Sequence, residues 1–419
     1  MMTHSEKMLQ ALEKEDLAQA QLELTQALEN DDLEVLEALG EELLSIGFLE
    51  EAQQVFETLK NKDTTSIVYN LPLAEIAIEN DQIETAFDLL ETVPKEDERY
   101  PEALLLLADL YQVLGIPEVS ENKLLEAARI IPEEPLIQFA LAELYFSMDR
   151  FSEAEGLYQQ LLLEGVDTFS GISITERIGT ALTMQGKFEE AVQILEKALE
   201  KNQSDDLLFQ LALVYRQLKE NDKTIFYLKQ LREQNPQYQA LYLYLAESLQ
   251  EEELLEEAQL VIEEGIHENP YQVDFYHFAS ENSYRLHDPK KAEEFLQEAL
   301  KVGEKEEKTL LLLSDLYLNE ERFEEVIDCL DTPDVLDNPY AAWNLAHAYN
   351  ELEEYEQAKR YYEEANVALA HEPDFMKEYG IFLREEGQLQ ESLTLLTHYL
   401  EHEPGDLEVL SILEDLKER

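Results

Sequence analysis

The stretch from residue 340 to residue 365 shows the pattern from which the rest of the chain is built. Its apolar residues form two stripes of helical spacing, which are Ala342, Leu345, Ala346 and Tyr349 in the first half and Ala358, Tyr362 and Ala365 in the second. The mostly polar segment 351–355 between them is long enough only for a tight turn, so the pattern predicts two antiparallel helices. Neither helix can bury its stripe alone, and the pair therefore needs neighbours of the same kind.

Small residues repeat along nearly the whole chain at steps of 32 to 37 residues, most of them 34. If Ala358 is the twentieth position of a 34-residue unit, that position holds Ala20, Ala52, Ala86, Ser120, Ala154, Ala191, Thr224, Ala258, Ala292, Val326, Ala358 and Ser392. From the second unit onward the eighth position is also small, and it holds Gly40, Ala74, Ala108, Ala142, Gly179, Ala212, Ala246, Ser280, Ser314, Ala346 and Gly380. Small residues at both positions allow two helices to approach closely, which predicts tightly packed helix pairs.

This arrangement resembles the tetratricopeptide repeat (TPR) family, whose 34-residue helix pair has small residues at positions 8 and 20, a tyrosine near 11 and a proline at 32. The tyrosines are Tyr111, Tyr145, Tyr215, Tyr317 and Tyr349, and the prolines are Pro132, Pro236, Pro270 and Pro404. The resemblance covers about residues 8 to 405. It implies an all-α fold, an α-solenoid of about 12 stacked TPR helix-turn-helix pairs that form a right-handed superhelix with a C-terminal capping helix. In length and repeat layout the chain is similar to the YpiA-type acidic TPR proteins of low-GC Gram-positive bacteria.

The repeat pattern predicts five consecutive segments. They are an N-terminal capping helical hairpin (1–30), a first part of the TPR array (31–164), an irregular hinge (165–173), a second part of the array (174–405) and a C-terminal capping helix (406–419). The hinge is predicted because the step from Ala154 to Ala191 is 37 residues and the extra residues fall in a segment rich in Gly and Ser. The C-terminal helix has an apolar stripe, which we expect to be its buried face: Leu407, Leu410, Leu413 and Leu416.

Acidic side chains outnumber basic ones by 94 to 31, which gives a net charge of −63 at pH 7. Nucleic acid and anionic membranes favour clustered Lys and Arg, so neither is an expected partner. No stretch has the length of apolar sequence that a membrane span needs, and residues 1–12 lack a basic region followed by an apolar run. We therefore expect no membrane insertion and a cytoplasmic location. The acidity also suits the solubility of a long solenoid, and a saline habitat would favour it as well.

The sequence contains no motif that carries chemistry. Its 13 glycines lie mostly at turns between helices, and there is no nucleophile elbow, Walker-type lysine or zinc-protease motif. Cys329 is the single cysteine, so neither a disulfide nor a thiolate cluster can form within the chain. His398 and His402 have a spacing that suits a metal, but without a third ligand a solvated helix face is the preferred interpretation. We therefore expect no catalytic residue, no metal and no cofactor, and a protein that is not an enzyme.

The TPR resemblance directs attention to positions 2, 5, 9 and 12, which line the concave surface of TPR arrays. Seven of eleven residues at position 9 are acidic, whereas a composition of 94 acids in 419 residues gives about two or three. We expect them to form an acidic stripe of Glu41, Glu75, Asp109, Glu143, Glu247, Glu281 and Asp315. Position 5 is mostly apolar, and there we expect partner anchors at Leu105, Phe139, Phe209, Leu243 and Trp343. The alternatives are that the acids serve solubility and that the apolar residues pack between repeats.

These features predict a non-enzymatic scaffold or adaptor. Its acidic concave groove would bind a basic or amphipathic segment of a partner protein, whether a peptide or a folded protein, and self-association stays open. Some TPR proteins hold a partner's C-terminal carboxylate with Lys, Arg and Asn at these positions, and this chain has carboxylates there instead. A peptide-sensing regulatory protein of the Gram-positive type and an accessory subunit of an enzyme complex are the alternative functions.

Overall fold

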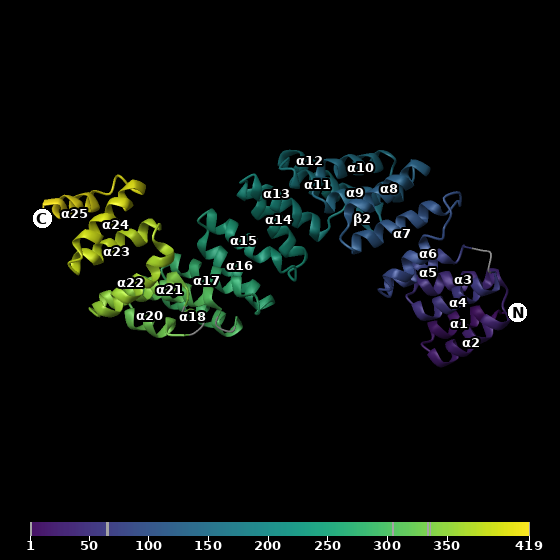
Figure 1. Ribbon diagram of the computed structural model, residues 1–419, viewed down its shortest axis with the longest axis horizontal. Helices are drawn as coiled ribbons and strands as arrows, with labels where there is room; N and C mark the ends of the chain where they lie inside the picture. The colour runs from purple at the N-terminus through teal and green to yellow at the C-terminus, as the bar shows by residue number, and fades with distance from the viewer. Residues whose placement is uncertain (1, 64–66, 304–305, 333–334, 336, 419) are drawn as a thin grey trace. The chain divides into compact units, whose positions relative to one another are not determined.

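The computed structural model describes residues 2–63, 67–303, 306–332, 335 and 337–418. Within these residues it contains 25 α-helices and one two-stranded β-hairpin, so the all-α prediction is confirmed. Successive helices pack as twelve pairs that are followed by one further helix (Figure 1). This is the arrangement that the 34-residue period predicts.

The chain divides into two compact units, unit 1 (residues 1–203) and unit 2 (residues 204–419). Unit 1 contains α1 (His4–Glu13), α2 (Leu17–Asn30), α3 (Leu33–Ser45), α4 (Leu49–Lys62), α5 (Asn70–Glu79), α6 (Ile83–Leu90), α7 (Tyr100–Val113), α8 (Pro117–Ile130), α9 (Pro135–Ser147), α10 (Phe151–Leu163), β1 (Thr168–Phe169), β2 (Ile172–Ser173), α11 (Ile174–Met184) and α12 (Phe188–Lys201). Unit 2 contains α13 (Asp205–Gln217), α14 (Asn221–Gln234), α15 (Ala240–Glu251), α16 (Leu255–Glu268), α17 (Val273–Arg285), α18 (Pro289–Val302), α19 (Glu307–Asn319), α20 (Phe323–Leu330), α21 (Pro339–Glu351), α22 (Tyr355–Leu369), α23 (Pro373–Glu385), α24 (Leu389–His402) and α25 (Leu407–Glu418).

The apolar interior of each unit runs from one helix pair into the next. In unit 1 one cluster of buried side chains extends from Met8 on α1 to Ile76 on α5, and another extends from Leu71 on α5 to Leu144 on α9. In unit 2 the clusters overlap in the same way, since α21 contributes to two of them and α23 to two. Each pair therefore completes its core with residues of its neighbours, as expected for a solenoid.

The small residues at positions 8 and 20 allow the close approach within a pair. A Cβ atom at Gly179 would lie 2.3 Å from a methyl group of Leu195, and one at Gly380 would lie 2.5 Å from a methyl group of Leu396. Where position 20 is Ser392, its hydroxyl donates to the carbonyl oxygen of Gly380 at 2.7 Å. The repeat pattern thus records how closely the two helices pack.

The turn between the two helices of each pair contains a residue in the left-handed region of φ. These residues lie five positions before position 20 in every pair: Glu15, Gly47, Asp81, Gly115, Asp149, Gly186, Lys219, Glu253, His287, Glu321, Glu353 and Gly387. Four of the twelve are glycine, which adopts this conformation without strain. The remaining eight have a Cβ atom, so the same backbone conformation costs them conformational energy.

The segment with three extra residues forms a β-hairpin rather than an open loop. Thr168 pairs with Ser173 and Phe169 with Ile172, and the turn residues Ser170 and Gly171 have φ values of 46° and 81°. Positive φ at both central residues is the geometry of a tight hairpin turn. A hinge at residues 165–173 stays a prediction, and this segment lies inside unit 1.

The ends of two helices test the sequence predictions in detail. The dipeptide of Asp288 and Pro289 predicts a capped helix start, and the Asp288 carboxylate accepts a hydrogen bond from the amide of Lys291 at 3.1 Å, so this prediction is confirmed. The helix α25 is present, but the prediction of its buried face is partly wrong. Leu407 is 79% exposed and Leu410 is 38% exposed, whereas the buried residues are Val409, Ile412, Leu413 and Leu416. The i, i+3 stripe drifts around the helix, and the residues that contact α23 and α24 follow the steps 3, 1 and 3.

Candidate partner-binding surface

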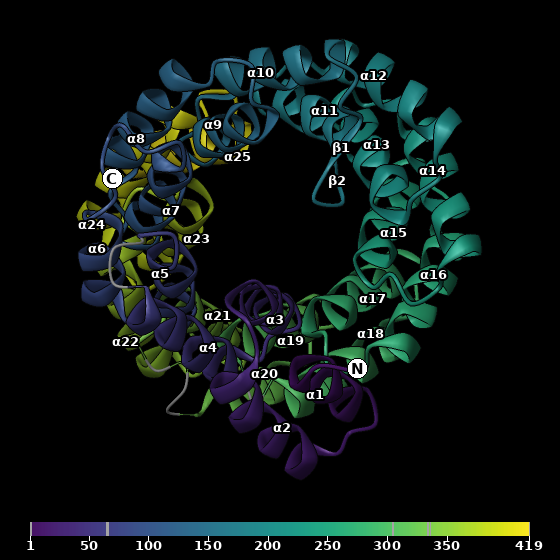
Figure 2. The same ribbon diagram turned by 90° about the vertical axis from the view of Figure 1, so that its right-hand side faces the viewer.

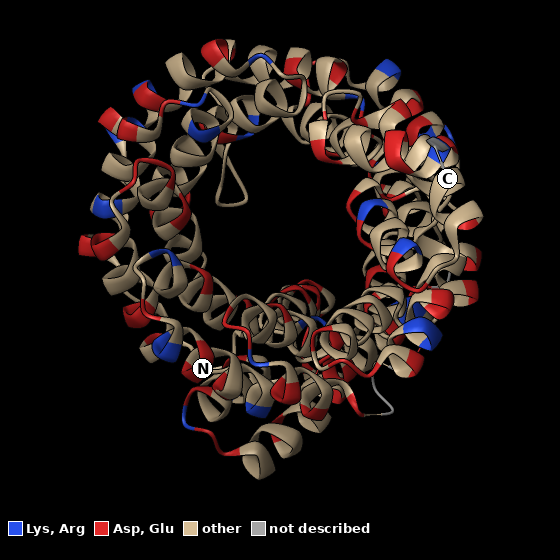
Figure 3. Cartoon of the chain, turned by 90° about the vertical axis from the view of Figure 1, so that its left-hand side faces the viewer, with Lys and Arg blue, Asp and Glu red and all other residues tan. Residues whose placement is uncertain are grey.

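The first helix of each pair lies on the inner side of each unit. In unit 1 this holds from α3 to α11, and in unit 2 from α13 to α23, with the second helices outside them (Figure 2). Positions 5 and 9 both belong to first helices. Acidic residues occur on inner and outer helices alike, with fewer Lys and Arg among them (Figure 3).

Two of the seven position-9 acids are already paired within the chain. Glu143 on α9 accepts a hydrogen bond from the Tyr158 hydroxyl at 2.5 Å and forms an ion pair with Arg177 at 2.8 Å. Glu247 on α15 forms an ion pair with Arg216 at 2.7 Å. These two carboxylates join neighbouring repeats, and their charge is neutralised before any partner arrives.

Three position-9 acids in unit 1 have no hydrogen-bond or ion-pair partner among the residues that the structure describes, and these are Glu41, Glu75 and Asp109. All three are exposed to water, yet the surrounding wall replaces part of the hydration of Glu75 and Asp109. This burial raises the pKa of Asp109 and that of Glu75, and for Glu75 the carboxylates of Glu102 and Glu79 raise it further. Unit 1 therefore holds unfavourably placed negative charge on its inner side.

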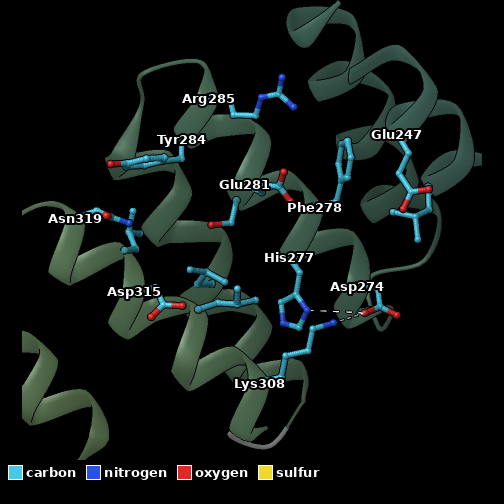
Figure 4. Close-up of a pocket in the computed structure, with 15 residues that line it drawn as sticks. Glu247, Asp274, His277, Phe278, Glu281, Tyr284, Arg285, Lys308, Asp315 and Asn319 are labelled. Atoms are coloured by element: carbon cyan, nitrogen blue, oxygen red, sulfur yellow. Dashed lines mark hydrogen bonds and ion pairs between the residues drawn. The ribbon is translucent and has the colours of Figure 1, made fainter. Parts of the chain in front are cut away.

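Unit 2 contains a groove with a volume of about 410 Å³ between α15, α17 and α19 (Figure 4). Its apolar lining includes Leu243, Phe278, Leu296, Leu312 and Leu316. Of these, the sequence predicts only Leu243 as an anchor, because positions 2, 5, 9 and 12 describe one face of one helix. The groove forms between helices, so residues next to that face, such as Phe278 and Leu312 at position 6, also line it.

Two carboxylates without a cationic partner stand on facing helices of this groove, Glu281 on α17 and Asp315 on α19 (Figure 4). Within the described part of the chain, Glu281 has no polar partner and Asp315 accepts one hydrogen bond, from the amide of Asn344 at 2.7 Å. Burial raises the pKa of Asp315, and the Asn344 hydrogen bond partly opposes this shift. The groove thus combines negative charge with apolar surface.

The basic groups of the groove are engaged with other acids. Arg285 forms an ion pair with Glu253 at 3.0 Å, and Lys308 approaches Asp274 at 3.4 Å. The buried His277 has its Nε2 atom 2.8 Å from the Thr309 hydroxyl, while its Nδ1 atom lies 3.8 Å from Asp274, beyond hydrogen-bond distance. Burial lowers the pKa of His277, with a further lowering by Lys308 that Asp274 and Glu306 oppose. The imidazole therefore adds little positive charge at neutral pH.

The predicted apolar anchors differ in how open they are. Leu243 lines the groove, and Leu105 is half-buried against the core of unit 1. Phe209 contacts Tyr238 and Tyr244 with ring centroids 5.1 and 5.5 Å apart, and Trp343 contacts Phe375 at 5.6 Å. Phe139 is only 8% exposed, because Phe169 of β1 stacks on it at 4.6 Å. The structure thus gives Phe209, Trp343 and Phe139 contacts within the chain, and a role for any of the five toward a partner stays a prediction.

His371 lies beside the histidine pair of α24, a contact that the spacing of the histidines along the chain does not predict. The ring centroids of His371 and His398 are 5.7 Å apart, and those of His398 and His402 are 5.4 Å apart. Across the described ranges, however, no group of three or more His, Cys, Asp or Glu side chains is arranged to hold a metal ion.

Comparisons with known proteins agree with this architecture. Models of YpiA-like tetratricopeptide repeats match residues 112–166, those of YpiA-like C-terminal tetratricopeptide repeats match residues 339–406, and two further tetratricopeptide repeat models match residues 173–204 and 206–238. The helix pairs and these matches define a TPR protein.

The TPR repeat-containing protein YpiA of Bacillus subtilis (strain 168) is 35% identical over 338 residues, which are 80% of this chain and 80% of that protein. The chain therefore belongs to the YpiA-like TPR family. Similar solved structures include the APC/C hetero-tetramer Cut9-Hcn1, with 13% identity, a TM-score of 0.41 and coverage of 98% of this chain and 95% of that one. Another is YrrB, described as a TPR protein with an unusual peptide-binding site, with 20% identity, a TM-score of 0.37 and coverage of 48% and 97%.

Among the helices that the structure describes, none has the length and apolar character needed to cross a membrane.

Proposed function

We propose that this protein is a non-enzymatic scaffold or adaptor that binds a basic, amphipathic segment of a partner protein in the groove of unit 2. TPR arrays generally mediate protein–protein interactions. The preference for a basic, amphipathic segment rests on one observation. Glu281 and Asp315 stand over an apolar groove lining and lack a cationic partner among the described residues. The same proposal places the protein in the cytoplasm and leaves self-association open.

Each part of the groove selects one property of the partner. The leucines of the lining, which include Leu243, Leu312 and Leu316, favour an apolar face on the bound segment. A lysine or arginine next to that face would reach Glu281 or Asp315 and form a charge-assisted hydrogen bond. Because the wall partly removes the hydration of Asp315, a bound cation gains more there than at a fully solvated carboxylate. A basic amphipathic segment meets both conditions.

Two acids of the groove already have cationic partners within the chain, so they contribute less to binding a basic segment. Glu247 also lines the groove, but Arg216 already neutralises it. Asp274 likewise has Lys308 beside it. Binding should therefore depend on Glu281 and Asp315 more than on the number of acids in the stripe.

The test uses two fluorescent 18-residue helical peptides of identical apolar face, one with lysine and one with glutamate on the polar face. At low salt the full-length protein should bind only the lysine peptide, and Glu281→Lys with Asp315→Lys should weaken binding about 100-fold. Raising the salt concentration should weaken the wild-type complex in the same direction. Fluorescence anisotropy gives the dissociation constants.

The matched control changes the same charge on outer helices. Glu294 on α18 and Glu324 on α20 are exposed and have no polar partner among residues the structure describes. Glu294→Lys with Glu324→Lys should leave the affinity within a factor of about two or three, because the groove is untouched. An equal loss in both double variants would show that net charge, not the groove, attracts the peptide.

Crosslinking and the affinity of short peptides separate this proposal from the alternative functions. A scaffold should capture a folded protein through such a segment, and crosslinking at the groove would recover it. A peptide-sensing regulator should instead bind one short peptide tightly and gain little from the rest of a protein.

A further inference from the structure

The β-hairpin lies on the inner side of unit 1, over a residue that belongs to the concave surface of that unit. Phe169 of β1 stacks on Phe139 of α9 with ring centroids 4.6 Å apart and planes inclined by 21°. Figure 2 shows the hairpin extending from α10 and α11 toward the inner side of unit 1. The chain therefore covers one of its own position-5 residues with a segment that the 34-residue repeat does not include.

The surface under the hairpin is aromatic and rigidly held. The Tyr158 ring lies 6.4 Å from Phe139, and its hydroxyl is fixed by Glu143. Arg177 lies on the other side of Glu143 and also over the ring of Phe146, 5.4 Å from its centroid. Glu143 thus binds both Tyr158 and Arg177, and what this wall offers to an aromatic ligand is the face of Phe139.

The attachment of the hairpin depends on few contacts. Each strand has two residues, and Phe169 is the only aromatic residue between positions 165 and 173. Ser170 and Gly171 at the tip are exposed. A two-stranded hairpin of this size is marginal by itself, so the aromatic stack is a large part of what holds it in place.

We infer that the concave surface at α9 binds an aromatic side chain presented on an extended segment, and that the hairpin occupies this surface in cis. A partner segment of the same chemistry binds only when it displaces Phe169 from Phe139. The hairpin itself shows which occupant fits, namely an extended backbone with one aromatic ring. Because Arg177 neutralises Glu143, this surface does not select a basic segment, and the inference is independent of the groove in unit 2.

The test compares binding of two neutral peptides, acetyl-Thr-Thr-Phe-Thr-Thr-amide and its Phe-to-Ala analogue, to the full-length protein by saturation-transfer NMR. In Phe169→Ala the Phe peptide should bind about two- to tenfold more tightly than in wild type, the range expected for one aromatic pair. The Ala peptide should gain nothing. Phe139→Ala combined with Phe169→Ala should abolish the gain.

A second variant loosens the hairpin without removing the ring. Gly171 has a φ of +81°, and no neighbouring atom lies within 4 Å of the place a Cβ atom would take, so Gly171→Val strains the turn alone. It should give a smaller gain in affinity for the Phe peptide. Phe226→Ala, which removes a 60% exposed ring from α14, is the matched control and should change nothing. Equal binding by wild type, Phe169→Ala and Gly171→Val, or a gain that survives loss of Phe139, would overturn the inference.

Discussion

The inner surfaces of both units carry paired and unpaired acids at position 9, and the two kinds of acid have different surroundings. In unit 1 the stripe ends at Glu143, which is bound by Tyr158 and Arg177 beside the hairpin. In unit 2 it begins with the paired Glu247 and continues to Glu281 and Asp315 in an apolar groove. One repeat position thus supplies both structural ion pairs and carboxylates that are open to a partner.

The difference shows that residue type at a repeat position does not decide its role. The charge of an acid at position 9 is neutralised when an arginine of a neighbouring repeat forms an ion pair with it, as Arg177 and Arg216 do. An acid without such a neighbour stays charged on a wall that partly removes its hydration.

The largest expected effect on stability concerns the paired acid Glu143. Glu143→Ala leaves the buried Tyr158 hydroxyl without its acceptor and Arg177 without its ion pair, which should destabilise unit 1 by about 1–3 kcal/mol. Glu281→Ala removes no polar contact among the described residues and should change stability by less than about 0.5 kcal/mol. Native-state hydrogen exchange of the α9–α11 and α17–α19 amides measures both.

The control for Glu143 is Tyr158→Phe combined with Glu143→Ala. Removing the hydroxyl as well as its acceptor avoids an unsatisfied buried group, so the double variant should be less destabilised than Glu143→Ala. If Glu143→Ala and Glu281→Ala had equal effects on exchange, the division into structural and open acids would be wrong.

The next effect concerns the turn residues in the left-handed region of φ. Gly186 of unit 1 and Lys219 of unit 2 occupy this place in two consecutive helix pairs. Gly186→Ala in unit 1 places a side chain at a φ of +74° without a clash and should destabilise by about 1 kcal/mol. Lys219→Gly in unit 2 removes that strain at a φ of 59° and should stabilise by about 0.5–1 kcal/mol. Urea denaturation of the full chain gives the direction of each change, and a loss on Lys219→Gly would contradict the strain at these turns.

The sequence predicted those features that depend on contacts within one repeat. The small residues at positions 8 and 20 and the helix start at Pro289 follow from local spacing, so the sequence alone reveals them. The prediction for α25 is partly wrong because Val409 and Ile412 are selected by their contacts with α23 and α24, which a single stripe of leucines does not reveal. Phe169 over Phe139 depends on a hairpin thirty residues away.

The ion pairs of the position-9 acids could be predicted from the sequence only in part. Arg177 is 34 residues after Glu143, but the repeat step here is 37 residues, so Arg177 stands at position 6 of the next unit, three residues before position 9. The ion pair could be recognised only with the knowledge of which side-chain positions face each other across neighbouring helices. The groove lining at Phe278 and Leu312 was missed for the same reason.

The smallest expected effect concerns the raised pKa values of one open acid in each unit. Because burial raises the pKa of Asp109 and of Asp315 in the folded chain, each contributes stability below the pKa of the unfolded chain, near 3.8, and loses it as the pH rises through the folded value. At pH 7 the ionised carboxylates are therefore unfavourable. Asp109→Asn should stabilise by a few tenths of a kcal/mol at pH 7, after allowance for solvent screening, and by less near pH 3.

Asp315→Asn should stabilise less than Asp109→Asn, since the Asn344 hydrogen bond already favours the Asp315 carboxylate. Only Asp315→Asn should also weaken the lysine peptide, because Asp315 faces the groove and Asp109 belongs to unit 1. Urea midpoints at pH 7 and pH 3, with peptide titrations of the same samples, separate the two effects. A stabilised Asp315→Asn variant with unchanged affinity would mean that this carboxylate is strained without serving the groove, and Glu281 alone would then have to account for the selection of a basic partner.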